Sequence, residues 1–576
     1  MNQLKKLTSL FLIISFSLIF FAPFEAKAAW REPIRAKNAI VASQHPLASK
    51  IGSDVMQRGG NAIDAAIAVA IALAVTYPEA GNLGGGGFML IRFKDGKTTA
   101  IDYREMAPKA ANRDIFIGKD GNVIRGEGGS TIGYRASGVP GTPAGLDFAF
   151  KKYASGKIKW ADLIEPSRKI AQNGYILTNR LANLLVAYKA NLEKYGDSKK
   201  IFLNNGNYYK EGDLFKQPEL AQTLLRMQKT GVKDFYEGTT ARLIADDMKA
   251  NNGLITLEDL KNYKVRERIP LRGSYRGHEI ITMPPPSSGG IVMLQTLAML
   301  EKHDIRQMGW ASSGKYHVLT EALRRAYADR SEYMGDPDFA DVPVAKLLDK
   351  NYLEQRGATI NLSKASTSRE ILPGVGLGKE PSETTHFTVV DKEGTIVTNT
   401  YTINDLYGSG VTAKGTGVLL NDEMDDFAAR PGTANLFGLI QGERNKVEGG
   451  KRPLSSMTPT IVLRKDGKPW FALGARGGPR IITAVLQTVI NMIDHDMNIQ
   501  QAIDSPRIHH QWLPDELVFE PFGMSNDTRK ALEALGHKFA ARPAYVAQAT
   551  GIAIEEKTGV RLGAIDSRGD GEAIGY

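Results

Sequence analysis

The sequence predicts a chain of mixed helices and strands in which antiparallel sheets pack on each other and helices cover them. Three observations carry this prediction. Residues 65–75 are apolar on every side of a helical pattern, as in a helix buried within a large core. Residues 143–335 are dominated by apolar residues three to four positions apart, which indicate helices. After residue 384 the pattern changes to short strands with alternating apolar residues. We interpret the mature chain as one layered domain.

Composition excludes several classes of protein. The chain has 576 residues, 42% hydrophobic and 24% charged, which suits a globular protein with a large core. It has no cysteine, which excludes disulfides, a thiolate nucleophile and cysteine-ligated zinc. The net charge of +10 is scattered, with no basic run carrying aromatic residues, so we expect no nucleic-acid partner. The nine histidines form no ligand motif, and His509-His510 would point apart, so we expect no metal and no cofactor.

The N-terminus has the pattern of a secretory signal. Lys5 and Lys6 give the positive start, residues 10–21 the apolar stretch, and residues 26–28 the small-residue cleavage site. The apolar stretch is too short to span a bilayer. We therefore predict a signal peptide over residues 1–28, export to the periplasm or the medium, and no membrane anchor.

The helices begin early in the mature chain. Residues 43–76 predict two helices that are interrupted at Gly59-Gly60, with Asn61 as the cap of the second. Further helices are predicted over residues 178–195, 217–230, 241–251 and 315–334. The proline-rich residues 283–290 predict a loop that caps a following helix.

A glycine run and an arginine stand between these helical regions. Residues 84–87 are all glycine, but neither a Walker lysine nor a dinucleotide fingerprint accompanies them, so we expect close backbone packing. A hairpin is predicted over residues 88–103, with its turn at Asp95-Gly96. Arg104 follows its second strand. An arginine there is most often a solvated surface group, unless a carboxylate ligand needs a bidentate partner.

The later part of the chain predicts antiparallel hairpins. Their strands are residues 387–390 with 395–403, 460–463 with 470–473, and 552–555 with 560–564. Residues 363–382 read as a loop that enters the first of these strands at Thr384. A threonine there is usually only a β-branched residue in a strand. The sharper hypothesis is a chain cut before Thr384, which makes its hydroxyl a nucleophile and its freed α-amine the base.

Several motifs resemble one known family. Thr384-Thr385-His386-Phe387-Thr388-Val389, with Gly394, Thr400-Tyr401-Thr402-Ile403-Asn404 and Gly408, is similar to the signature of the γ-glutamyltranspeptidases. The matching motifs around it are residues 104–108, 421–427, 451–457 and 477–480. The resemblance covers residues 33–576. Thr395 departs from it, since the family has Ser or Asn there, but this residue lies in a hairpin turn.

The resemblance implies an N-terminal-nucleophile hydrolase fold, a four-layer αββα sandwich of two antiparallel sheets between helices. It also implies a proenzyme that cuts itself between Glu383 and Thr384. The products would be a large chain of residues 29–383 and a small chain of residues 384–576, which stay together as a heterodimer. The cut would free an α-amine with a pKa of about 7.7–8, close to the optimum for a base at neutral pH.

The resemblance further implies a role for each motif. Thr384 would attack the γ-amide of glutathione or another γ-glutamyl donor, and the ester would pass to water, an amino acid or a dipeptide. Thr402 would orient the nucleophile, and the N–H groups of Gly477 and Gly478 would form the oxyanion hole. Arg104, Ser455 and Ser456 would hold the α-carboxylate, and Asn404, Glu423 and Asp426 the α-ammonium. Residues 430–450, with Phe437, resemble a lid over the pocket.

Each motif also has a plainer interpretation. Asp425-Asp426 would be a solvated turn, Ser455-Ser456 a loop or cap, Gly477-Gly478 a tight turn and residues 430–450 a long surface loop. Their order and spacing favour the family. The alternatives are a cephalosporin acylase or a capsule poly-γ-glutamate transferase with the same chemistry, against which the lid and the ammonium ligands argue. A periplasmic solute-binding protein, with two parallel-sheet lobes, is a further alternative.

Overall fold

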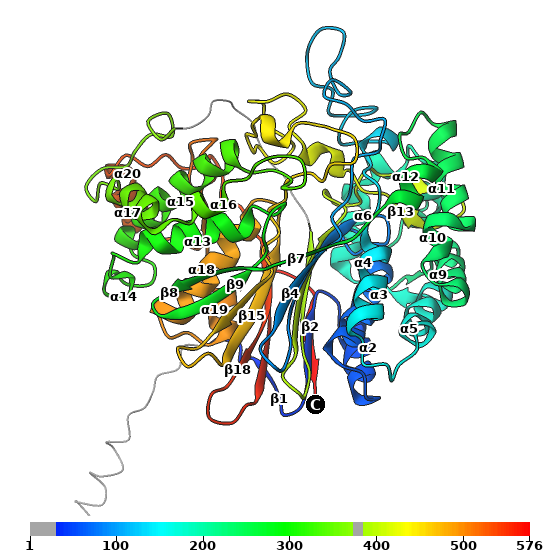
Figure 1. Ribbon diagram of the computed structural model, residues 1–576, viewed down its shortest axis with the longest axis horizontal. Helices are drawn as coiled ribbons and strands as arrows, with labels where there is room; N and C mark the ends of the chain where they lie inside the picture. Colours follow the sequence, from blue (N-terminus) through cyan, green and yellow to red (C-terminus); the bar gives the residue numbers. More distant parts are fainter. Residues whose placement is uncertain (1–29, 373–383) are drawn as a thin grey trace, which may run out of the picture. The chain divides into compact units, whose positions relative to one another are not determined.

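Two seven-stranded antiparallel sheets lie face to face between helices within residues 33–576 (Figure 1). The computed structural model describes residues 30–372 and 384–576. The predicted signal peptide and Glu383 lie outside the described residues. The four layers confirm the predicted αββα sandwich. Because every strand pair in both sheets is antiparallel, the two parallel-sheet lobes of a solute-binding protein are excluded for the described chain.

Both halves of the sequence contribute strands to each sheet. In the first, here the β10 sheet, the order is β20(Glu572–Gly575), β2(Ile40–Ser43), β10(Thr385–Val390), β11(Ile396–Thr402), β3(Gly86–Arg92), β4(Thr98–Asp102) and β7(Arg266–Arg268). In the second, the β15 sheet, it is β1(Ile34–Ala36), β19(Arg561–Ile565), β18(Gln548–Ile554), β15(Pro469–Arg476), β14(Thr460–Leu463), β9(His278–Thr282) and β8(Leu271–Tyr275). All four predicted hairpins are confirmed.

The two faces of β10 meet different layers, as its alternation requires. Phe387 and Val389 belong to the core between the β10 sheet and the helices beneath it. His386 points the other way, and its ring lies so close to Gly474 of β15 that a Cβ there would be 2.3 Å from it. Thr398 Oγ1 also donates to the Leu473 carbonyl at 3.3 Å, across the two sheets. The strand that follows Thr384 is therefore fixed on both faces.

The buried helix is confirmed as α3(Ala62–Thr76), in which every residue is buried. Asn61 caps it through a capping box with Asp64, and α2(Pro46–Gln57) precedes the predicted interruption. These two, α4(Thr142–Tyr153) and α5(Trp160–Asn173) cover the β10 sheet, and α9(Pro218–Thr230) and α11(Thr239–Ala250) lie further out (Figure 1). The β15 sheet is covered by α13(Gly289–Leu300), α15(Ser313–Tyr333), α18(Arg480–Asp494) and α19(Ile499–Asp504) (Figure 1).

One predicted helix is wrong in extent. Residues 178–195 form α6(Asn179–Ala187) and the short α7(Lys189–Leu192), with Tyr188 at φ −97° and ψ 8° between them. The Tyr188 ring packs on Tyr407, with the ring centroids 5.6 Å apart. Apolar spacing alone does not reveal this break, since the tyrosine continues the helical pattern while its ring is held by a distant residue.

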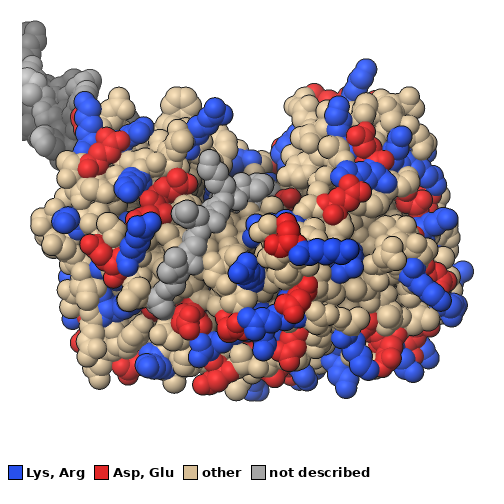
Figure 2. Space-filling view, turned by 90° about the horizontal axis from the view of Figure 1, so that it is seen from above, with Lys and Arg blue, Asp and Glu red and all other residues tan. Residues whose placement is uncertain are grey.

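The charged side chains on the surface and the two adjacent histidines are arranged as the sequence predicts. Acidic and basic side chains are interspersed over the face in Figure 2. In the described part of the chain no helix has the length and apolarity that crossing a bilayer requires. Nor do the described residues hold a cluster of metal-ligating side chains. His509 contacts Thr483 and Gln511, whereas His510 contacts Asp515, so the two neighbours point apart as predicted.

Candidate active site

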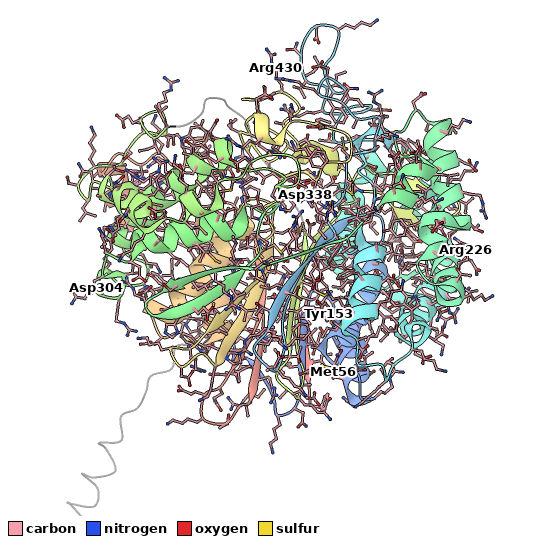
Figure 3. All side chains as sticks on the ribbon, viewed as in Figure 1. Met56, Tyr153, Arg226, Asp304, Asp338 and Arg430 are labelled. Atoms are coloured by element: carbon pink, nitrogen blue, oxygen red, sulfur yellow. The ribbon has the colours of Figure 1, made fainter. Side chains whose placement is uncertain are left out.

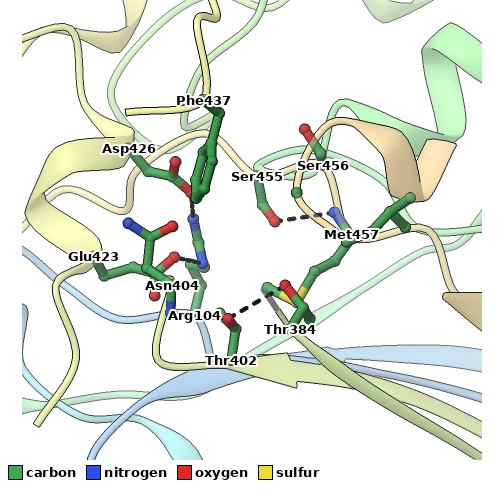
Figure 4. A pocket seen from close by; sticks show the side chains of 12 residues that line it. Arg104, Thr384, Thr402, Asn404, Glu423, Asp426, Phe437, Ser455, Ser456 and Met457 are labelled. Atoms are coloured by element: carbon green, nitrogen blue, oxygen red, sulfur yellow. Dashed lines mark hydrogen bonds and ion pairs between the residues drawn. The ribbon is translucent and has the colours of Figure 1, made fainter. Parts of the chain in front are cut away.

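Side chains from seven separate stretches of the chain converge on one cavity beside the start of β10 (Figure 4). The lining residues are Arg104, Thr384, Thr402, Asn404, Glu423, Asp426, Phe437, Ser455, Ser456, Met457, Gly478 and Ile481. The cavity has a volume of about 20 Å³. All but two of the lining residues are candidates that the sequence singled out. The space is far smaller than the roughly 300–1,000 Å³ of ordinary ligand pockets, so a ligand requires the walls to move.

Thr384 has one hydroxyl neighbour, Thr402 at the end of β11 (Figure 4). Their Oγ1 atoms lie 3.3 Å apart. The backbone N–H of Asn404 donates to Thr402 Oγ1 at 2.9 Å. The Thr402 oxygen thus accepts a backbone N–H and also lies within hydrogen-bond distance of Thr384 Oγ1, a contact in which either hydroxyl could be the donor. Asn404 supports this geometry from the left-handed conformation, at φ 76°.

The two carboxylates in the cavity wall, Glu423 and Asp426, both contact Arg104, which makes them poor candidates for the base that activates the Thr384 hydroxyl. The wall contains no histidine and no lysine. His386, two residues from Thr384, lies between the sheets and contacts Thr400 Oγ1 at 2.8 Å. Desolvation lowers the pKa of His386 to about 3, so this ring stays neutral and faces away from the nucleophile. An α-amine on Thr384 itself would supply the missing base.

Arg104 is fully buried, and it pairs with acids of this same wall (Figure 4). Its Nη1 contacts Glu423 and Glu105, and its Nη2 contacts Asp426. Its Nε donates to the Pro453 carbonyl at 3.3 Å. Burial excludes the plainer interpretation of Arg104 as a solvated surface group. The groups expected to hold a carboxylate and an ammonium separately contact each other here.

Acids outnumber cations on this side of the cavity. Glu423 and Asp426 lie on the 3-10 turn η3(Glu423–Asp426), and both are buried. Burial raises the pKa of Glu105 to about 7, with the Arg104 charge opposing the shift. Burial also raises the pKa of Asp425 to about 6, and that of Glu423 well above its ordinary value. A cationic ligand group would lower all these pKa values and pair with the carboxylates.

Ser455 and Ser456 form the wall across from these acids (Figure 4). Ser455 Oγ accepts the Met457 N–H at 3.1 Å, and the Ser455 carbonyl accepts the Ser288 N–H at 2.8 Å. Arg452, just upstream, is buried. Its Nε lies 3.4 Å from Asp102 Oδ1, and its Nη1 lies 3.8 Å from a carboxylate oxygen of Asp338, a residue labelled in Figure 3. This anchor fixes where the serine segment runs.

Gly477 and Gly478 link β15 to α18. Their φ angles are 134° and 51°, which favour glycine, and a Cβ on Gly477 would lie 2.8 Å from the Ala547 Cα. No described residue accepts a hydrogen bond from either N–H. Gly478 lines the cavity, whereas Gly477 is not among the lining residues. Within the described residues both N–H groups thus lack an acceptor, and the two glycines directly precede Pro479, the N-cap of α18.

The loop of residues 430–450 contributes one side chain to the cavity wall. Phe437 is 3% exposed and lines the cavity. Asn435 accepts the N–H of Phe437 at 3.0 Å, and its Nδ2 donates to Asp426 Oδ1 at 3.1 Å. Gln511 Nε2 holds the Phe437 carbonyl at 3.1 Å. The loop is thus attached directly to an acid of the cavity wall.

Some residues of this region were not found from the sequence. Met457 and Ile481 line the cavity, and Glu105 contacts Arg104 from behind. Each directly adjoins or lies within a motif that was identified. Their residue types, however, carry no chemistry that a sequence pattern could single out.

Comparison with known proteins agrees with this geometry. The chain matches the Gamma-glutamyltranspeptidase family over residues 48–576. It belongs to the γ-glutamyltranspeptidase family. A relative, the glutathione hydrolase proenzyme of Escherichia coli (strain K12), is 49% identical over 513 residues, which cover 89% of this chain and 87% of the relative.

Solved structures of family members also match. The chain of the Helicobacter pylori γ-glutamyltranspeptidase crystal structure is 46% identical, with a TM-score of 0.56, and the match covers 60% of this chain and 97% of that one. The crystal structure of a cephalosporin acylase from Bacillus halodurans is 25% identical, with a TM-score of 0.83, and the match covers 96% of this chain and 99% of that one. The N-terminal-nucleophile hydrolase fold is thereby confirmed.

Proposed function

We propose that this family member is a self-processing γ-glutamyltranspeptidase. It cleaves γ-glutamyl compounds such as glutathione through an ester on Thr384, and transfers the γ-glutamyl group to water, amino acids or short peptides. The observation that carries the proposal is the Thr384 hydroxyl, 3.3 Å from Thr402 Oγ1 in a cavity whose wall offers no histidine or lysine as base. The similarity to glutathione hydrolase proenzymes supports the donor.

Maturation supplies the missing base. A cut between Glu383 and Thr384 would give chains of residues 29–383 and 384–576 and would free the Thr384 amine. That amine takes the Oγ1 proton as the oxygen attacks the γ-carbonyl carbon. The N–H groups of Gly477 and Gly478 would hold the resulting oxyanion, a contribution of about 2.7–4 kcal/mol for such a donor. The amine then returns the proton to the leaving nitrogen, and an ester remains.

The charged ends of the donor require opposite partners. Glu423 and Asp426 suit the α-ammonium, with Asn404 beside them. Arg104, Ser455 and Ser456 suit the α-carboxylate. Because the closed cavity is too small for a glutamyl group, Phe437 and its loop must open for entry. An exported protein with these chains would meet its donors outside the cytoplasm.

The test is maturation together with turnover. The purified protein should run as two bands on a denaturing gel, and the shorter chain should begin Thr-Thr-His-Phe. It should hydrolyse γ-glutamyl-p-nitroanilide. A Thr384→Ala variant should remain one band without activity. A Thr384→Ala protein that still matures and turns over the donor would remove Thr384 as nucleophile.

An acylase acting on another acyl group is the second candidate. The fold match to the cephalosporin acylase, with a TM-score of 0.83, favours it. Such an enzyme would bind glutaryl compounds, which lack the ammonium that Glu423 and Asp426 suit. Parallel assays with γ-glutamyl-p-nitroanilide and a glutaryl-cephalosporin distinguish the two, and preference for the glutaryl compound would reverse our choice.

A further inference from the structure

Arg330 differs from the other fully buried arginines. Five arginines are among the largest fully buried side chains of the described residues. Four have a carboxylate partner: Arg104 with Glu423, Arg325 with Glu321, Arg452 with Asp102 and Arg507 with Asp566. Arg330, on α15, contacts two serine hydroxyls instead. Its Nη1 has no hydrogen-bond partner in the described part of the chain. A buried charge with no carboxylate at ion-pair distance among the described residues is costly, so this arrangement suits an anion nearby.

The two serines connect Arg330 to the cavity. Its Nε donates to Ser288 Oγ at 2.9 Å, and Ser288 Oγ donates to the Ser455 carbonyl at 2.7 Å. Its Nη2 lies 3.5 Å from Ser456 Oγ, a length at which the contact is mainly that of a charge with a hydroxyl dipole. The Pro-Pro-Pro-Ser-Ser loop before α13 therefore lies between α15 and the serine wall.

Both hydroxyls of the serine wall keep a free proton. An arginine only donates, so Ser456 Oγ is the acceptor and its O–H can point elsewhere. Ser455 Oγ accepts the Met457 N–H at 3.1 Å, which likewise leaves its O–H free. Two O–H donors in a cavity wall, with a guanidinium behind them, form a site for an anion.

The opposite wall, which contains Arg104, attracts an anion less strongly. There Arg104 contacts three carboxylates, those of Glu105, Glu423 and Asp426. Ser455 and Ser456 lie across the cavity from Glu423 and Asp426 (Figure 4). A carboxylate would be repelled on the acidic side and attracted on the serine side, and an ammonium the reverse.

We propose that Arg330 is a positioning residue that provides, through Ser455 and Ser456, the positive potential for the α-carboxylate of the donor. This inference rests on the proposed function, which names the donor and gives Arg330 no part. Desolvation lowers the pKa of Arg330 to about 10, with the Tyr327 and Asp426 charges opposing, so its guanidinium remains charged at neutral pH.

The test separates binding from chemistry. Arg330→Met should raise KM for γ-glutamyl-p-nitroanilide about tenfold, equivalent to about 1.4 kcal/mol, while kcat stays within about threefold. Arg330→Lys keeps the charge and should restore KM to within about threefold of the wild type. Arg325→Met is the matched control, because Arg325 is also buried on α15 but pairs with Glu321. It should lower Tm and leave KM unchanged.

A second measurement does not depend on turnover. Binding of L-glutamate to the mature protein should weaken about tenfold in Arg330→Met, whereas 4-aminobutyrate, which lacks the α-carboxylate, should be unaffected. Should Arg330→Met not fold, Ser288→Ala removes the Nε acceptor and should raise KM with kcat retained. An unchanged KM in these variants, or an equal rise in Arg325→Met, overturns the proposal. If the wild type does not hydrolyse the donor, only the proposed function is refuted. In that case the role of Arg330 is overturned if Arg330→Met binds L-glutamate as tightly as the wild type does.

Discussion

At the residue scale, we propose that the Thr402 hydroxyl helps to orient Thr384. Thr402→Val keeps the β-branched shape on β11 and removes the hydroxyl whose oxygen lies 3.3 Å from Thr384 Oγ1. We expect kcat for γ-glutamyl-p-nitroanilide to fall about 100-fold, the typical cost of a misplaced reacting group, with little change in KM. Steady-state kinetics on purified mature protein measure this, and processing should also slow.

Thr400→Val is the matched control for that loss. Thr400 lies two residues earlier on β11, and its Oγ1 contacts His386 Nδ1 at 2.8 Å, away from the nucleophile. Its kcat should stay within about threefold of the wild type. If both valine variants lose activity equally, the effect arises from the strand and not from the Thr402 hydroxyl.

Sequence patterns identified most of this site because its chemistry-bearing residues lie in short motifs. Thr384, Asn404 and Ser455 could be named, yet their contacts could not be predicted. Arg104 was assigned to a carboxylate, and only the structure reveals that Glu423 and Asp426 contact it first. Arg330 lies in a helical run rich in charge, where a buried arginine looks the same as a solvated one.

At the scale of elements, the glycine run determines how closely β3 approaches β11. A Cβ on Gly85 would lie 2.0 Å from the Thr402 carbonyl oxygen, inside contact distance. Gly85→Ala should therefore displace the end of β11 and destabilise the protein by about 1–3 kcal/mol, as overpacking does. Urea unfolding of the Thr384→Ala background measures it. Gly126→Ala is the control, since nothing lies within 4 Å of its added Cβ.

The strand pattern predicted which residues share a face of β10, but it did not predict the depth of burial. Alternation placed His386 opposite Phe387, and the structure agrees. That the second face meets the β15 sheet, and not water, is seen only in contacts between the sheets, such as that of the His386 ring with Gly474. The break at Tyr188 is likewise not predictable from local spacing, and the ring of this residue packs on the distant Tyr407.

His386 should make stability depend on pH. Its pKa is lowered to about 3 in the fold, from 6.5 when unfolded. The unfolded chain therefore binds more protons below pH 6.5, and stability is lost as pH falls. From pH 7 to pH 5 this histidine should remove about 2 kcal/mol. In the Thr384→Ala background, His386→Gln should lose that much less on acidification, measured by urea unfolding at both pH values. An identical loss in both proteins would contradict this assignment.

At the scale of the whole molecule, the predicted cut would divide two sheets whose strands interleave. In the β10 sheet, β2 of the large chain lies between β20 and β10 of the small chain, and β11 pairs with β3 over seven residues. In the β15 sheet, β1 pairs with β19 and β9 with β14. Trp512 Nε1 also donates to the carbonyls of Ser368 and Ile371, at 2.8 and 3.0 Å.

The two chains should therefore separate only by unfolding. Separation breaks strand ladders in both sheets and exposes the apolar core on each side, so we expect neither chain to retain a fold of its own. After maturation, native mass spectrometry should give one species containing one copy of each chain, although a denaturing gel gives two bands. In a urea titration, loss of that species and loss of the circular-dichroism signal should share one midpoint. A small chain released below that midpoint with its strand signal intact would contradict the interleaved architecture as the source of association.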